Sequence, residues 1–247
     1  MSGQAQLLID AGNSRVKAAL LHAGVPGEVA SWPHAQIDAL PAWLTAQKQP
    51  VSHAWMVSVA SEELNAAIHA ALAAKDITLT RWRGAPLPSG FLNAYAAPTL
   101  GPDRLLAALA ARRAHTAQVL VVASFGTATT VDLVAGDTFR GGVIAPGIGL
   151  MAASLAQSTA HLPLSQGRLV PVPDNTHDAI YTGICAAQRG AVTHMLDAAA
   201  PLGSPQLVIC GGNAAAIAPA LPPHVLLPDA VLKGLAQVAT ASAAPSA

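Results

Sequence analysis

Short apolar runs that end at glycine or small polar residues alternate along this chain with longer Ala- and Leu-rich stretches of helical spacing. The short runs predict strands and the longer stretches predict helices. Strands are expected at 6–10, 15–22, 27–31, 54–58, 78–81, 118–123, 129–135, 138–144 and 207–210. Helices are expected near 36–47, 61–75, 101–114, 147–157, 176–199, 212–218 and 230–238, followed by a frayed tail at 239–247. This alternation of strands and helices predicts an α/β fold.

One pattern, an apolar strand followed by a glycine turn and a second strand, occurs twice. The first copy covers residues 7–17, and the second covers 119–134, about 110 residues later. Internal repetition at this scale predicts two lobes of similar fold. We place these lobes at residues 1–115 and 116–247.

The turn of the first copy has residue types suited to phosphate and metal binding. Asp10 ends an apolar strand and can serve as a ligand for a hydrated divalent cation. Gly12 lets the backbone approach a phosphate closely, and Asn13, Ser14 and Lys17 carry hydrogen-bond donors for its oxygens. The same residues also make a good β-hairpin turn. Both interpretations stay open at this point.

A second acidic residue, Asp103, stands at the predicted start of the helix at 101–114. Pro102 before it suits a first helical position, and an acidic residue in the first turn stabilises a helix. Asp103 could equally act as a general base that takes a proton from a hydroxyl group, with Arg104 binding an anionic part of the substrate. The residues alone do not decide between these roles.

Composition excludes several classes of protein. Although 52% of the residues are hydrophobic, no run of eighteen apolar residues lacks a Gly, Pro or polar break, so no membrane span is expected. The amino terminus lacks the features of a secretory signal, which makes the cytoplasm the expected location. Thirteen basic and thirteen acidic residues form no basic stripe, so we expect no nucleic-acid binding. Two cysteines and nine scattered histidines suggest neither a disulfide framework nor a zinc site.

An ordered set of motifs resembles type III pantothenate kinase. The motifs lie at 10–17, 101–104, 126–130, 141–147 and 175–183, in the order of the family and over nearly the whole chain. The resemblance implies the fold of the acetate and sugar kinase/Hsp70/actin superfamily, with two ribonuclease-H-like lobes and a nucleotide cleft between them. It also implies ATP-dependent phosphorylation of pantothenate, the first step towards coenzyme A, by a homodimer.

The resemblance assigns roles to individual residues of this chain. Asp103 would be the general base that activates the primary hydroxyl of pantothenate, and Thr127 would add a hydroxyl contact to the nucleotide. The ATP phosphates would face the first motif, with Asp10 as the Mg²⁺ ligand: Asp10, Ala11, Gly12, Asn13, Ser14, Arg15, Val16 and Lys17. Pantothenate would contact Tyr95, Gly101, Pro102, Asp103, Arg104 and Thr176.

Two glycine turns in the second half leave questions that the resemblance does not answer. Ser124 stands where many family members have an Asp that coordinates a monovalent cation. A hydroxyl is a poorer cation ligand than a carboxylate, so K⁺ dependence is less expected, and ammonium or another ligand set could serve. The turn at 211–213 could lie on the adenine side of the nucleotide site or be only a tight turn.

Two other functions remain alternatives. One is a regulatory accessory protein with weak or no kinase activity, and the other is a phosphatase or ATPase of the same superfamily with another substrate. The presence of Asp10, Lys17, Asp103 and Arg104 argues against an inactive protein. The absence of a basic patch argues against direct DNA binding.

Overall fold

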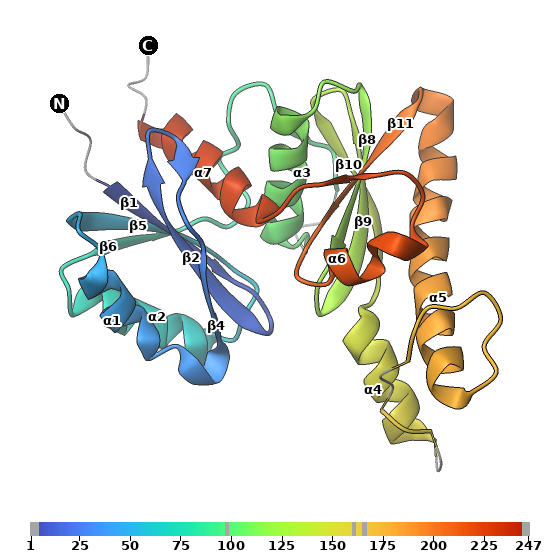
Figure 1. Cartoon of the computed structure of the whole chain (residues 1–247). Coiled ribbons are helices and arrows are strands. Elements are labelled where there is room, and N and C mark those ends of the chain that lie inside the picture. Colours follow the sequence, from blue (N-terminus) through green and yellow to red (C-terminus); the bar gives the residue numbers. More distant parts are fainter. Residues whose placement is uncertain (1–4, 97–98, 160–161, 165–166, 244–247) are drawn as a thin grey trace. The chain divides into compact units, whose positions relative to one another are not determined.

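The computed structural model describes residues 5–96, 99–159, 162–164 and 167–243 (Figure 1). The chain forms two compact units. Unit 1 comprises the described residues within Met1–Leu92, Ala96–Ala110 and Asp229–Ala247, and unit 2 comprises Asn93–Tyr95 and Ala111–Pro228. The lobes predicted from the sequence differ from these units, because residues from 229 onward group with unit 1.

Unit 1 contains a sheet with the strand order β3-β2-β1-β5-β6, in which β4 also pairs with β2. Its strands are β1 (Ala5–Ala11), β2 (Arg15–His22), β3 (Val25–Pro26), β4 (Ala30–Pro33), β5 (Val51–Ser58) and β6 (Thr78–Arg81). Its helices are η1 (His34–Gln36), α1 (Ala39–Ala46), α2 (Glu62–Ala73), α7 (Ala230–Ala243) and α3 (Pro102–Ala114) as far as Ala110.

Unit 2 contains a sheet with the strand order β12-β11-β8-β9-β10-β7. Its strands are β8 (Val119–Phe125), β9 (Ala128–Ala135), β10 (Thr138–Pro146), β11 (Pro205–Cys210), β12 (Val225–Leu226) and β7 (Leu92–Asn93), of which Leu92 groups with unit 1. Its helices are α4 (Ile148–Ser158), α5 (Thr176–Ala199), η2 (Ala200–Leu202), α6 (Ala214–Ile217) and η3 (Ala218–Ala220).

The two sheets share one topology, which confirms the repeat predicted from the sequence. In each, a first strand pairs antiparallel with the second and parallel with a strand that follows a helix: β1 with β2 and β5, and β8 with β9 and β11. The registers also agree. Asp10 lies opposite Lys17, and Ser124 lies opposite Thr130. Asp10 and Ser124 therefore occupy equivalent places, each two residues before the glycine of its turn.

Successive side chains of β1 point to opposite faces of the sheet, and this alternation explains how unit 1 packs. Leu7, Ile9 and Ala11 point into one apolar core together with buried side chains of α1 and α2. The strand also contacts α7, whose Gly234 allows an unusually close approach to the backbone of Leu106 in α3. The carboxyl end of β1, where Asp10 lies, is thus held by buried neighbours.

The observed elements correct three details of the sequence prediction. The strand expected at 27–31 is wrong, because pairing with β2 divides this region into β3 and β4. The helix expected at 36–47 is replaced by η1 and the shorter α1. The described part of the tail does not fray, since α7 continues to Ala243, while 244–247 lie outside the described residues. Within the described ranges, no helix is both long and apolar enough to cross a membrane.

Candidate active site

The turn between β1 and β2 is closed by a backbone hydrogen bond and contacted by a histidine side chain. The Gly12 N–H donates to the Arg15 carbonyl at 3.0 Å, and a His34 ring nitrogen lies 2.9 Å from the Gly12 carbonyl oxygen. Asn13 and Ser14 are exposed at the tip of the turn. The Arg15 guanidinium instead donates to the hydroxyl and the carbonyl of Ser31 in β4. A ligand at this turn would therefore meet Asn13 and Ser14 first.

Asp10 has an unusual electrostatic environment. Burial raises the pKa of its carboxyl group to about 7, and the neighbouring charges of Asp103 and Asp229 also raise it. The Lys17 ammonium opposes this rise, although Lys17 also forms a 2.7 Å ion pair with Asp229. The charges of Asp103, Lys17 and Asp229 therefore all act on Asp10, and the four residues belong to unit 1.

Asp103 and Arg104 begin helix α3. Burial raises the pKa of the Asp103 carboxyl group, while the backbone N–H groups of Arg104 and Asp103 and the Arg104 charge oppose the rise. The carboxylate lies back over Gly101, where a Cβ atom would stand 2.6 Å from Asp103 Oδ1. Pro102 is the first residue of the helix, as expected, and Arg104 is buried. A partly desolvated carboxyl group of raised pKa suits a general base near neutral pH.

The Asp10 carboxylate is of the type that binds Mg²⁺. A divalent cation beside Asp10 would stabilise its charged form and so offset the desolvation and like-charge repulsion that raise its pKa. Within the described part of the chain, no group of three or more His, Cys, Asp or Glu residues could enclose a metal on its own. Mg²⁺ commonly needs no such group, because it is bound through one or two carboxylates together with waters and phosphate oxygens.

The second glycine turn lies in unit 2, between β8 and β9. The Gly126 N–H donates to the Ala128 carbonyl at 3.0 Å, and Thr127 is exposed at the tip. Asn213 supports this turn, since its side-chain amide donates to the Gly126 carbonyl at 3.3 Å. Its backbone N–H donates to the Phe125 carbonyl at 2.9 Å. The turn at 211–213 therefore packs on the Gly126 turn.

The remaining residues assigned to the substrate lie in unit 2. Tyr95 packs its ring on Gly141, where a Cβ atom would stand 2.9 Å from Tyr95 Cδ2, and lies 6.3 Å from the Phe139 ring between centroids. Thr176 is exposed as the first residue of α5. Within unit 1, by contrast, the fold brings together Asp10, Lys17 and Asp103.

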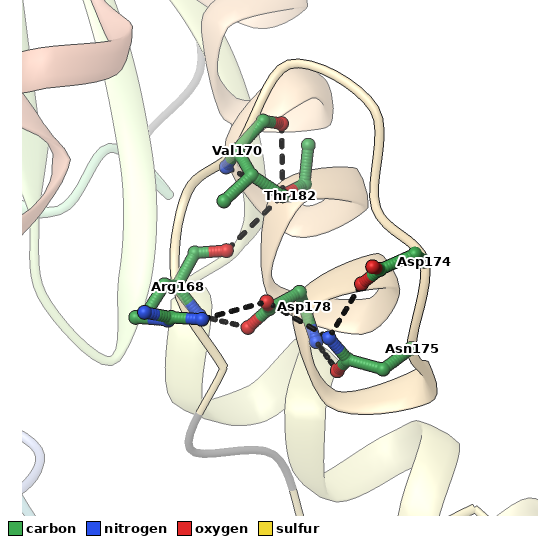
Figure 2. Close-up of polar contacts among 6 residues, drawn as sticks. All are labelled: Arg168, Val170, Asp174, Asn175, Asp178 and Thr182. Atoms are coloured by element: carbon green, nitrogen blue, oxygen red, sulfur yellow. Dashed lines mark hydrogen bonds and ion pairs between the residues drawn. The ribbon is translucent and has the colours of Figure 1, made fainter.

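A buried carboxylate organises the start of α5 (Figure 2). Asp178 accepts hydrogen bonds from the Arg168 backbone N–H at 2.7 Å and from the Asn175 amide at 3.0 Å. Asn175 in turn caps the helix by accepting from the Asp178 N–H at 3.0 Å. Thr182, one turn further along, contacts the backbone of Arg168 and Val170. These bonds hold segment 168–170 against α5 and fix the helix start next to Thr176.

We expect Asp178→Asn to lower the melting temperature by a few degrees at neutral pH, because it weakens these bonds. The hydrogen bond from the Arg168 N–H, followed by that from Asn175, holds the pKa of Asp178 below its usual 3.8. This stabilisation is complete above about pH 4 and is lost as the pH falls through the folded-state pKa. Scanning calorimetry should therefore show the difference from wild type shrinking below about pH 4.

Asp174→Asn is the matched control, since Asp174 is exposed and its Oδ1 accepts a single hydrogen bond of 3.2 Å, from Asn175, in Figure 2. It should melt as wild type does. Equal losses in both variants, or a difference that persists at acid pH, would contradict the role of Asp178.

The sequence did not single out two acidic residues, Asp178 in unit 2 and Asp229 in unit 1. Asp178 had a detectable signal, because Asn at a helix start followed three residues later by an acidic residue is typical of a reciprocal helix cap. Asp229 had a weaker one, an acidic residue ahead of the predicted helix at 230–238. Its pairing with Lys17 spans 212 residues of sequence, which no local pattern can indicate.

The structure also contains a 440 Å³ cavity that holds none of the predicted site residues. The Arg112 guanidinium there donates to the carbonyl groups of His115 and Ala117, which follow α3. This arginine therefore closes the end of a helix. The cavity is lined by Arg112, Arg113, His115, Thr116, Gln118, Gly136 and Asp137.

A family model described as Type III pantothenate kinase matches residues 6–198. The chain belongs to this family. A type III pantothenate kinase from Bordetella petrii is 41% identical over 255 residues, which cover 94% of this chain and 96% of that protein. Family membership confirms the resemblance seen in the motifs and makes the chain a kinase homologue over nearly its full length.

Solved structures share the fold at much lower identity. A conserved Campylobacter jejuni protein assigned to the Baf family of transcriptional activators has a TM-score of 0.63 and 20% identity, with 96% of this chain and 98% of that chain covered. An inorganic polyphosphate/ATP-glucomannokinase from Arthrobacter has a TM-score of 0.53 and 14% identity, with 97% and 100% covered. These likenesses confirm the predicted α/β, actin-like fold.

Proposed function

We propose that this chain phosphorylates pantothenate with ATP to give 4′-phosphopantothenate, the first step of coenzyme A synthesis, and that Asp103 is its general base. The observation that carries the proposal is the grouping of Asp10, Lys17 and Asp103 in unit 1 of a chain that belongs to the type III pantothenate kinase family. Two motifs more than eighty residues apart in sequence thus supply side chains whose charges act on Asp10.

Asp103 accepts the proton of the substrate's primary hydroxyl as its oxygen forms a bond to the γ-phosphorus of ATP. The bond from that phosphorus to the β,γ-bridging oxygen breaks, and ADP leaves. Its raised pKa makes Asp103 a stronger base than an ordinary aspartate. Arg104, next to it, binds the anionic group of pantothenate. Phosphoryl transfer depends chiefly on positioning and charge stabilisation, which these residues provide.

The nucleotide is held by the first glycine turn in this proposal. Asn13, Ser14 and Lys17 donate to phosphate oxygens, Gly12 admits the phosphates close to the backbone, and Asp10 holds Mg²⁺. When bound, Mg²⁺ would neutralise charge that develops on the phosphate oxygens. Thr127 of unit 2 adds a hydroxyl contact to the nucleotide. Tyr95, Gly101, Pro102 and Thr176 contribute to the pantothenate site.

We further propose that a monovalent cation matters less here than in family members that carry an Asp at the Ser124 position. Ser124 is half-buried and offers one hydroxyl oxygen. Assays in K⁺, NH₄⁺ and Na⁺ at constant ionic strength test this point. A large activation by K⁺ alone would contradict it.

A homodimer is also part of the proposal, supported by the family resemblance and by exposed apolar side chains in unit 2, among them Ile144, Leu150 and Val172. Light scattering on the purified chain measures its mass directly. A mass of 24.9 kDa at assay concentrations would contradict the dimer.

Pantothenate-dependent release of ADP from Mg-ATP is the decisive assay. We expect ADP to form only when pantothenate is present, together with an equal amount of phosphopantothenate measured by mass spectrometry. ADP formation that does not depend on pantothenate would favour an ATPase or phosphatase. No turnover at all, in protein that binds pantothenate or nucleotide, would favour an accessory protein.

A further inference from the structure

Lys17 and Asp229 form an ion pair that links the first glycine turn to the last helix. Lys17 Nζ lies 2.7 Å from Asp229 Oδ1, and the two side chains are 28% and 30% exposed. Lys17 lies in β2 directly opposite Asp10, and Asp229 stands immediately before α7. All three residues belong to unit 1.

The backbone fixes the place of the Asp229 carboxylate. Asp229 has a φ of +50°, in the left-handed region that few residues other than glycine adopt, although Asp and Asn are enriched there. Its carbonyl accepts from the Lys233 N–H at 3.0 Å, so it is part of the first turn of α7. Helix α7 in turn packs on β1, β2, β3 and β5. The carboxylate is therefore anchored to the same sheet that carries Lys17.

Asp10 and Asp229 compete for the Lys17 ammonium. Residues directly opposite each other on antiparallel strands have Cβ atoms about 4.5–5.5 Å apart, so a lysine at this position can reach its neighbour. The Lys17 charge does act on Asp10, yet its hydrogen bond goes to Asp229. The ammonium is thus bonded to Asp229 while it remains near enough to Asp10 for its charge to act there.

We propose that Asp229 is a positioning residue for Lys17, which it holds beside Asp10 so that both can act on the phosphates and Mg²⁺ of a bound nucleotide. This inference rests on the proposed function. The ammonium has three hydrogens, of which one goes to Asp229 and two remain for phosphate oxygens. Asp10 keeps its oxygens for the metal. In protein kinases, too, a lysine that binds phosphate is held by a carboxylate from a helix.

A double-mutant cycle tests the inference through nucleotide binding alone. We expect Asp229→Asn to weaken binding of Mg²⁺ and a non-hydrolysable ATP analogue by about 5–10-fold in calorimetry, since a neutral amide holds the ammonium less firmly. Adenosine, which lacks phosphates, should bind equally to variant and wild type. In a Lys17→Met background, Asp229→Asn should change affinity for the analogue by less than about 2-fold.

Two further variants secure the interpretation. Asp229→Gly removes the acceptor altogether while tolerating the left-handed backbone, and it should weaken binding at least as much as Asp229→Asn. Glu62→Gln is the matched control, because it breaks the 3.0 Å Arg81–Glu62 ion pair, which is also in unit 1. It should leave the affinity for the analogue unchanged. Melting temperatures establish that each variant is folded.

The outcomes separate this inference from the proposed function. Unchanged or tighter binding in Asp229→Asn, or an effect that persists in Lys17→Met, overturns the positioning role while wild-type turnover of pantothenate still supports the kinase. If the double-mutant cycle gives the expected result but the protein shows no pantothenate-dependent turnover, the positioning role is supported and the proposed function is overturned. A wild type that binds no nucleotide overturns both.

Discussion

Replacing Asp103 by Asn is expected to lower kcat for pantothenate-dependent ADP release by about 10²–10⁴-fold. The amide has nearly the same size and stays at the start of α3, but it cannot accept the proton of the substrate hydroxyl. A coupled assay of ADP formation measures the loss. Turnover near that of the wild type would exclude Asp103 as the base.

The Michaelis constants distinguish loss of a base from loss of binding. Asp103 is one of the charges that raise the pKa of Asp10, so removing it lowers that pKa and favours the charged carboxylate. The KM for Mg-ATP should therefore stay the same or fall, and kcat should carry the effect. Asp38→Asn is the matched control, since Asp38 is exposed, precedes α1 and makes no side-chain cap. It should leave kcat unchanged.

Gly211→Ala is expected to destabilise unit 2 by about 3 kcal/mol, because it combines backbone strain with a collision. Gly211 has a φ of +93°, and a Cβ atom there would lie 2.5 Å from the Phe125 carbonyl oxygen. The Phe125 carbonyl also accepts a hydrogen bond from the Asn213 N–H. A shift that relieved the collision would therefore displace Asn213, whose side chain supports the Gly126 turn. Activity should fall together with stability.

The neighbouring Gly212→Ala is the matched control. A Cβ atom at Gly212 would meet nothing within 4 Å, and Gly212 has no positive φ. Its stability should stay within about 0.5 kcal/mol of wild type. All four tryptophans lie in unit 1, so fluorescence follows that unit while far-UV circular dichroism follows both. The denaturation midpoint by circular dichroism should fall for Gly211→Ala only; equal midpoints for the two variants would contradict the collision.

The sequence predicted most of the strands and helices because their boundaries have local causes. Gly12 and Gly126 end apolar strands, and Pro102 begins a helix. The prediction errors occur where contacts between distant segments determine the secondary structure. Residues 27–31 have no strong pattern of their own, and β2 selects 30–33 as its partner. Residues 239–243 alternate Ala, a strong helix former, with Thr240 and Ser242, whose hydroxyls donate to carbonyl groups one turn earlier, so α7 continues through them.

The candidate site was predicted residue by residue only where a motif marks it. Asp10, Lys17 and Asp103 belong to motifs, and unit 1 brings their charges together. The ion pair of Lys17 could not be predicted, because its partner Asp229 is brought near only by the packing of α7 on the sheet. The raised pKa of Asp10 likewise depends on burial, which the sequence does not report.

The return of α7 to unit 1 sets an order for folding on the ribosome. Unit 2 is nearly continuous in sequence, and its last residue is synthesised before Asp229. Unit 1 starts first but lacks α7 until residues 230–243 have been synthesised. Domains that emerge whole can fold as the chain is made. The half that begins first is therefore finished last, and the Lys17–Asp229 contact forms only after residue 229 has left the exit tunnel.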